Sequence, residues 1–343
     1  MAYTTIKKPS DYFTPNLHNG TGSTRNITGI GFQPDFTIVK RRDTTGVWYN
    51  TDIVRGAGKQ MYLNETGGMG SSASTTEITG FNSDGFNLGT DGGVNASGGT
   101  YVSYNFLGNN TTGSSNTDGT ITSTVSANTT AGFSIVKFTG TGANATVGHG
   151  LSSAPSMMIV KGLSFVDNWC VFHSSLGGGK KLKLNTTGAE ITSSSAWNNT
   201  SPTSSVFSVG TDGETNNNGS TMIAYCFADV QCYSKFGKYT GNGSTDGSFV
   251  YTGFKPAFVM VKRTDTTKNW YLQDNSRNGY NASNPYLSPN INVAETGGTE
   301  VDLLSNGFKL RAGGTGHNES GGTYIFMAFA EQPLVGDNPA TAR

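Results

Sequence analysis

The chain has 343 residues, of which only 13% are charged, and its 23 basic and 23 acidic side chains cancel. No region carries the clustered basic excess that phosphate binding requires, which argues against a nucleic-acid partner. The 48 glycines and the steady supply of aromatic residues, with few helix-forming runs, predict short strands joined by many turns.

Residues 1–16 are predicted to form an N-terminal arm. Lys7, Lys8 and two prolines discourage regular structure there, while Tyr12 and Phe13 give the arm side chains with which to dock. No apolar stretch suits a secretory signal or reaches the length of a membrane span. We therefore expect synthesis in a cytoplasm and no membrane insertion.

One pattern occurs three times along the chain. In each copy a proline precedes a tryptophan by fourteen residues, and a phenylalanine follows that tryptophan after thirty-eight: Pro34, Trp48 and Phe86; Pro155, Trp169 and Phe207; Pro256, Trp270 and Phe308. This fixed spacing indicates three copies of one module of roughly 100 residues. We assign repeat 1 to residues 17–108, repeat 2 to 125–230 and repeat 3 to 231–334.

The apolar run after each proline predicts a strand that is buried on both faces, and the following turn and tryptophan predict a hairpin. These runs cover residues 36–40, 157–161 and 258–262, and each repeated tryptophan is interpreted as a core anchor. With six or seven strands expected per copy and no helix, the pattern predicts an all-β chain of three tandem antiparallel β-sandwich modules. Lectin-like and immunoglobulin-like topologies both remain open.

The connections between the repeats differ. Residues 109–124 are almost all Asn, Thr, Ser and Gly, and they are predicted to form a flexible linker. Repeats 2 and 3 have no room for a hinge between them, so we expect a rigid pair; a pseudo-threefold unit of all three repeats is an alternative. Residues 335–343 are predicted to form a polar C-terminal tail.

Polar residues recur at fixed distances after each tryptophan. Four and seven residues after it stand Asp52 and Arg55, His173 and Leu176, and Asp274 and Arg277. The two Asp–Arg pairs are interpreted as loop salt bridges on the surface, although such a pair could also line a polar site.

Residues that could carry chemistry do not form a recognisable set. The four histidines occupy different places in their repeats, so they are not copies of one ligand set: His18, His149, His173 and His317. Glu190 or Glu295 with Asp274 would supply the two carboxylates of a glycosidase, but the spacing does not show that they converge. The loop 212–218 is oxygen-rich enough to consider Ca²⁺ yet lacks a dense acidic pattern.

The cysteines complete this picture. Cys170, Cys226 and Cys232 have neither disulfide-framework nor metal-binding spacing, and the first two lie in strand-like runs where a buried, inert thiol is expected. We predict no catalytic residue, no metal site and no cofactor.

Several motifs are distinctive enough to compare with known families. They are Gly-Phe-Lys-Pro-Ala-Phe-Val-Met-Val-Lys at 253–262, the run 305–311, and above all Tyr-Ile-Phe-Met-Ala-Phe-Ala-Glu at 324–331, with the ending 339–343. The opening residues 1–13 and the stretch 132–150 point to the same family as these motifs. Together they resemble a family of repeat-bearing structural proteins of tailed bacteriophages from marine and freshwater samples. The resemblance covers nearly the whole chain and implies a jelly-roll or concanavalin-like β-sandwich and a place on the virion. It transfers no catalytic or binding residues.

Three functional hypotheses follow. The first is a non-enzymatic structural protein exposed on the phage particle, either a short tail fibre for host adhesion or a head decoration, with other virion proteins and further copies of itself as partners. The second is a lectin-like module that binds a host cell-surface glycan through unrepeated loop aromatics, namely Trp197, Tyr280 and Tyr286. The third is a polysaccharide depolymerase, for which the sequence offers no catalytic pair.

Overall fold

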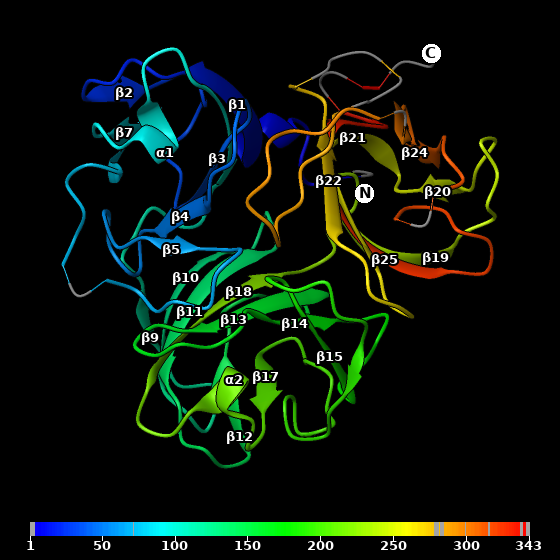
Figure 1. Cartoon of the computed structure of the whole chain (residues 1–343). Coiled ribbons are helices and arrows are strands. Elements are labelled where there is room, and N and C mark those ends of the chain that lie inside the picture. Colours follow the sequence, from blue (N-terminus) through cyan, green and yellow to red (C-terminus); the bar gives the residue numbers. More distant parts are fainter. Residues whose placement is uncertain are drawn as a thin grey trace.

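The structure is a computed structural model that describes residues 4–70, 72–277, 281, 285–298, 300–314, 316–336 and 339–340. It is all-β, and the named strands pair antiparallel in several sheets (Figure 1). In the described part of the chain no sheet closes into a barrel. Three stretches of chain lie around a common centre, and we call residues 13–106 the first segment, 114–227 the second and 234–333 the third.

The first segment forms two sheets. Its large sheet has the order β1 (Phe13–Asn19), β8 (Thr100–Phe106), β3 (Phe36–Arg41), β4 (Trp48–Asp52) and β5 (Met61–Tyr62). Its small sheet has the order β2 (Arg25–Ile27), β7 (Gly85–Leu88) and β6 (Ile78–Asn82). A one-turn helix, α1 (Gly92–Asn95), follows β7 and is capped by the Asp91 side chain.

The second segment repeats this plan with a wider large sheet. The large sheet has the order β16 (Ile191–Thr192), β15 (Lys180–Lys183), β14 (Cys170–His173), β13 (Met157–Gly162), β18 (Thr221–Phe227), β11 (Phe133–Thr139), β10 (Ser123–Asn128) and β9 (Ser114–Asn116). The small sheet pairs β12 (Ala145–Gly148) with β17 (Val206–Val209), and α2 (Gly213–Asn216) is capped by Asp212.

The third segment again has a large and a small sheet. The large sheet has the order β19 (Ser234–Thr240), β25 (Thr323–Pro333), β21 (Phe254–Arg263) and β22 (Trp270–Asp274). The small sheet has the order β20 (Phe249–Tyr251), β24 (Gly307–Leu310) and β23 (Val301–Leu304). The hairpins predicted from the repeated tryptophan are confirmed, because β3 pairs with β4, β13 with β14 and β21 with β22.

The central strands of each large sheet are buried on both faces, and alternate residues along these strands enter different cores. In β18, Tyr225 belongs to a core shared by all three segments, whereas Cys226 belongs to the second segment's own core. In β25, Met327 enters the shared core and Phe326 the third segment's own core. The predicted two-sided burial is therefore confirmed, and its cause is that one face packs inside its segment while the other meets the remaining two segments.

The shared core is built largely from aromatic side chains, and we call it the central core. Each segment supplies its repeated tryptophan, which confirms the interpretation of these residues as anchors: Trp48, Trp169 and Trp270 are all buried. Phe106, Phe227 and Phe329 meet there, with ring centroids 5.3 to 6.1 Å apart. Aromatic edge and stacking contacts of this kind add to the free energy gained by burying apolar area.

Two stretches expected to lack regular structure are part of the fold. The N-terminal arm contains a short 3-10 helix (Pro9–Asp11) and runs into β1, so that Phe13 is buried in the central core. Thr4 Oγ1 donates a hydrogen bond of 2.8 Å to the carbonyl of Gln231, which ties the arm to the connection between the second and third segments. The stretch 109–124 supplies β9 and the buried Ile121 to the second segment, so it is not the flexible linker that its composition predicts.

Candidate functional site

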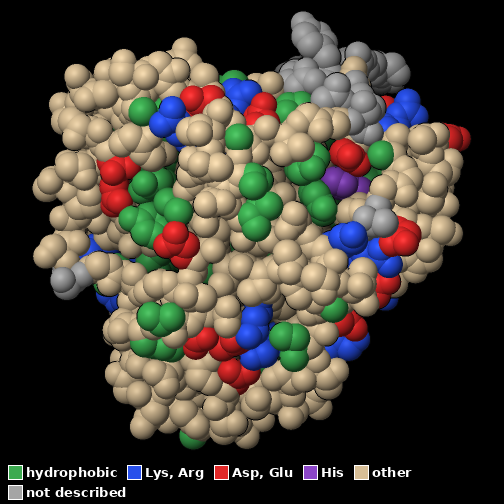
Figure 2. All heavy atoms as spheres, in the orientation of Figure 1, with side chains coloured by type: hydrophobic (Ala, Val, Ile, Leu, Met, Phe, Trp, Pro, Cys, Tyr) green, Lys and Arg blue, Asp and Glu red, His purple; other side chains and the backbone are tan. Residues whose placement is uncertain are grey.

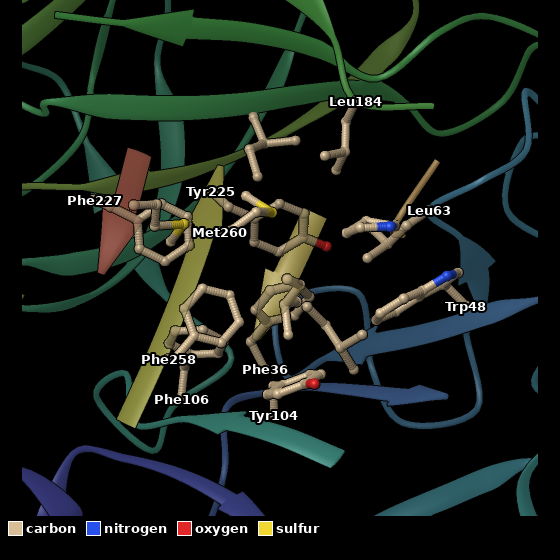
Figure 3. A pocket seen from close by; sticks show the side chains of 15 residues that line it. Phe36, Trp48, Leu63, Tyr104, Phe106, Leu184, Tyr225, Phe227, Phe258 and Met260 are labelled. Atoms are coloured by element: carbon tan, nitrogen blue, oxygen red, sulfur yellow. The ribbon is translucent and has the colours of Figure 1, made fainter. Parts of the chain in front are cut away.

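The centre of the molecule holds an apolar pocket with a volume of about 40 Å³ (Figure 3). Ile38, Ile159 and Met260 reach it from β3, β13 and β21, one from each segment. Leu63, Leu184 and Pro289 line it in the same way, one from each segment. Figure 2 shows several small groups of hydrophobic side chains on the surface, one of them near the centre of the face. A pocket of this size holds a small apolar group but no sugar ring, since ligand sites usually span roughly 300–1,000 Å³.

Polar groups around this pocket join the first segment to the second. Tyr225 Oη of the second segment donates a hydrogen bond of 2.7 Å to Asp52 Oδ2 of the first. Asp52 also forms an ion pair with Arg55, and both side chains are fully buried. Burial, together with the Asp52 carboxylate, raises the pKa of Tyr225 well above its usual value. The interpretation of this pair as a surface salt bridge is wrong, because the pair lies under the joint between two segments.

The same arrangement joins the third segment to the first. Tyr104 Oη donates a hydrogen bond of 2.7 Å to Asp274 Oδ2, and Asp274 is paired with the buried Arg277 at 2.6 Å. Arg277 also contacts Glu295 at 3.2 Å, and Glu295 in turn accepts hydrogen bonds from Arg42. Asp274 and Glu295, two of the carboxylates considered for a glycosidase, thus converge on one arginine. They cannot act on a glycan there, because Asp274 is buried and both carboxylates are held by arginine.

The joint between the second and third segments has different residues at all three of the equivalent positions. His173 stands where the other two segments have the aspartate, and its Nε2 lies 3.2 Å from the carbonyl oxygen of Phe326. Leu176 replaces the arginine, and Met327 replaces the tyrosine on the facing strand. Burial lowers the pKa of His173 to about 4, although its hydrogen bond to Phe326 opposes this shift. An uncharged joint with one hydrogen bond to a carbonyl therefore takes the place of an ionic one, with all three positions changed together.

The tryptophans link the segments in the same circular order. Trp48 Nε1 donates to the carbonyl of Ser288 at 3.1 Å, Trp169 Nε1 to that of Tyr62 at 3.0 Å, and Trp270 Nε1 to that of Lys183 at 3.1 Å. Each indole therefore donates to a different segment from its own, and the three hydrogen bonds form a closed ring.

Three buried lysines repeat that circle. Lys161 Nζ donates to the carbonyls of Thr66 at 3.0 Å and Asp167 at 2.9 Å, and so joins the second segment to the first. Lys262 in the third segment reaches the carbonyl of Thr187 in the second at 3.1 Å, and Lys40 reaches Asn292 at 3.5 Å. Burial lowers the pKa of each of these ammonium groups to about 8. The polar groups at the centre are thus engaged in holding the segments together.

Of the three aromatic residues predicted to contact a glycan, the structure describes two, and these two do not share one surface. Trp197 is completely buried in the second segment's own core, against Phe172, and therefore has no surface to offer a ligand. Tyr286 is half-buried and packs edge-on against Tyr271, with centroids 5.3 Å apart. Tyr280 lies outside the described residues.

The other candidates for chemistry are also engaged within the structure. Asp212 and Glu214 of the oxygen-rich loop both form ion pairs with Lys181, and Glu190 forms one with Lys180. Within the described residues, no group of three or more His, Cys, Asp or Glu side chains is placed to hold a metal ion. All three cysteines are buried, and burial raises the pKa of the Cys226 thiol to about 12.

One surface feature was missed from the sequence. Phe249 and Tyr251 on β20 are 47% and 56% exposed and lie on either side of the buried Val250. The strand register aligns Val250 with Ile27 and Val147, because these three residues face Phe308, Phe86 and Phe207. The flanking positions are Asn26 and Thr28 in the first segment and Thr146 and Gly148 in the second. The sequence could have revealed this surface, because the flanking positions hold aromatic residues in the third segment only.

None of the helices in the described part of the chain has the length and apolarity to cross a membrane. No curated protein and no solved structure matches the chain. One family does match, over residues 8–333, and it is described as a domain of unknown function (DUF7483). Because this match covers nearly the whole chain, the protein belongs to the DUF7483 family.

Proposed function

We propose that the chain is a non-enzymatic structural protein of a tailed-phage virion, exposed on the particle surface as a short tail fibre or a head decoration. The observation that carries this proposal is the closed ring of joints between the segments. Indole hydrogen bonds and buried lysines run from each segment to the next and back to the first, and Tyr–Asp pairs add to two of the three joints. Such a ring makes the chain a rigid body, because its central polar groups hold the segments together. This property is expected of a protein that must stay folded outside a cell.

We further propose that the segments are three copies of one jelly-roll or concanavalin-like β-sandwich, arranged about a pseudo-threefold axis. Equivalent positions support this proposal, because each segment places the same hairpin and the same tryptophan against the central core. Other virion proteins and further copies of this chain are the proposed partners, and the virion is the proposed location.

A lectin-like role is the second candidate. The specific observation in its favour is the exposed aromatic pair on β20, which the repeated architecture does not require. This role is compatible with the first, since an exposed virion protein can also bind a host glycan.

Gold-labelled antibodies raised against the purified protein would test the first proposal by electron microscopy of particles whose genome encodes the chain. Label spread over the head at lattice spacing would identify a decoration protein, and label on the tail would identify a fibre. Label that appears only after the particles are disrupted, or on neither part, would contradict exposure on the virion.

A further inference from the structure

The two aromatic residues of β20 lie side by side on the outer face of the third segment's small sheet. Side chains alternate along a strand, so Val250 points into the third segment's own core while Phe249 and Tyr251 point away from it. Two residues apart on a strand, their Cα atoms are separated by about 6.6 Å. Figure 1 shows β20 on the side of the third segment that faces away from the centre of the molecule.

Glycines leave room for both rings to lie over the backbone. A Cβ atom placed on Gly307, which pairs with Tyr251, would come within 3.1 Å of Phe249 Cε2. A Cβ atom on Gly253 would lie 3.6 Å from Tyr251 Oη, and the positive φ of 84° at this residue favours glycine in any case. Each ring therefore reaches over a glycine, and about half of each side chain remains exposed to solvent, which leaves ring surface on which a ligand can stack.

A hollow of about 320 Å³ begins at Tyr251 and lies near the connection between the second and third segments. Asp229, Gln231 and Lys235 line it with polar groups. Asp229 and Lys235 form an ion pair of 3.2 Å in which both side chains are about 40% exposed. This volume is at the lower end of the range for ligand sites, and the paired acceptor and donor suit the hydroxyl groups of one sugar ring.

The charges beside the aromatic pair also cancel. Lys309, which pairs with Phe249 across the strands, forms an ion pair with Asp246, and Arg311 forms one with Asp302 at 2.8 Å. With each cation already matched by a carboxylate, the surface offers hydrogen-bonding groups without net charge. That favours a neutral ligand over an acidic polysaccharide or a nucleic acid.

We propose that this surface is a binding site for a neutral oligosaccharide. One pyranose ring occupies the hollow against Tyr251 and the next stacks on Phe249, with hydroxyl groups bound by Asp229 and Lys235. The amphipathic faces of sugar rings match exposed aromatic rings that have polar groups at their edges. This inference rests on the lectin-like candidate function. It adds the position of the site, the class of ligand, and the course of the oligosaccharide along β20.

Affinity electrophoresis of the full chain in native gels would test the proposal. The gels would contain, separately, a neutral mannan, galactomannan or β-glucan, with sodium alginate as the acidic probe. The variants are Phe249→Ala and Tyr251→Ala, with Val166→Ala as a control. Val166 is an exposed apolar residue, 75% exposed, and it belongs to the second segment and not to this site. Tyr286→Ala tests the competing loop aromatic. We expect retardation by at least one neutral polysaccharide, with the apparent dissociation constant weakened roughly tenfold by each β20 variant and unchanged by Val166→Ala.

Other outcomes would overturn the proposal. These are retardation by alginate alone, loss of binding in Tyr286→Ala but in neither β20 variant, or no retardation by any of the polysaccharides. Loss of incorporation into particles by Phe249→Ala, without loss of glycan binding, would make the surface a protein interface instead. The antibody-labelling experiment reads virion location independently, so a failed glycan site and a failed virion assignment give different results.

Discussion

At the scale of single residues, the buried lysines near the centre of the molecule are costly groups, because no carboxylate among the described residues pairs with their ammonium groups. Lys40, Lys161 and Lys262 are completely buried and are hydrogen-bonded to carbonyl groups. A carbonyl carries only a partial charge, so it offsets less of the desolvation cost of an ammonium group than a carboxylate would. The chain keeps these lysines because each one satisfies carbonyls at the edges of two segments that would otherwise be buried without a donor.

This burial predicts that the free energy of unfolding rises between pH 7.5 and 9.0. Each lysine has a pKa of about 8 in the folded chain against 10.5 as the ordinary value, so the unfolded chain binds more protons in this window. The expected gain is on the order of 1 kcal/mol for each lysine, measured by urea unfolding. Above pH 9 the buried thiols of Cys170 and Cys226 act in the opposite sense, because their raised pKa values favour the unfolded chain there.

The variant Lys161→Met provides the comparison for this pH dependence. Its side chain is unbranched like that of lysine, although one atom shorter, and has no group that titrates, so the increase with pH should shrink by about a third. An increase identical to that of the unchanged protein would show that these lysines are not its source.

At the scale of elements, each hairpin ends in a set of side chains that matches the strand it faces. β4 ends at Asp52, with Arg55 three residues after it, and the strand opposite presents Tyr225. β14 carries His173, with Leu176 after it, and its facing strand presents Met327. The two versions are alternative solutions to the same joint, and mixing them would leave a buried charge without a partner.

This matching predicts strong coupling between substitutions at the first joint. Arg55→Leu alone should lower the free energy of unfolding by about 3–5 kcal/mol, because Asp52 would be buried without its ion pair. The triple variant Asp52→His, Arg55→Leu, Tyr225→Met recreates the set at the other joint. Its loss should be smaller than the sum of the three single losses by about 1–3 kcal/mol, measured by urea unfolding.

Lys8→Ala is the control, because Lys8 forms an exposed ion pair with Asp11 and its loss should change stability by less than about 0.5 kcal/mol. Additive losses in the triple variant would show that the three positions act independently.

At the scale of the whole molecule, the sequence predicts the strands and hairpins better than their arrangement. The apolar runs show that β3, β13 and β21 are buried on both faces, since apolar periodicity reports burial. Periodicity does not report what covers a face, so the central core and the burial of Asp52 and Asp274 could not be predicted. The loop position of Trp197 was likewise a poor guide to exposure, because a loop can fold a large ring into its segment's own core.

Because the central core draws on all three segments, we expect the chain to unfold in a single cooperative transition. Phe106→Ala should test this, since the ring contacts Phe133, Phe227 and Phe329 from the other two segments. Removing it creates a cavity at the shared centre and should cost about 3–5 kcal/mol. Amide hydrogen exchange should then show that protection of the slowest amides falls by the same free energy in all three segments.

Phe308→Ala is the matched control, because Phe308 is equally buried but belongs to the third segment's own core. If the segments unfold together, this variant too lowers the slowest exchange everywhere, and calorimetry gives one transition whose van't Hoff and calorimetric enthalpies agree. If each segment instead unfolds on its own, Phe308→Ala lowers protection in the third segment alone and calorimetry resolves separate transitions. The second result would mean that the joints between the segments orient them without stabilising them.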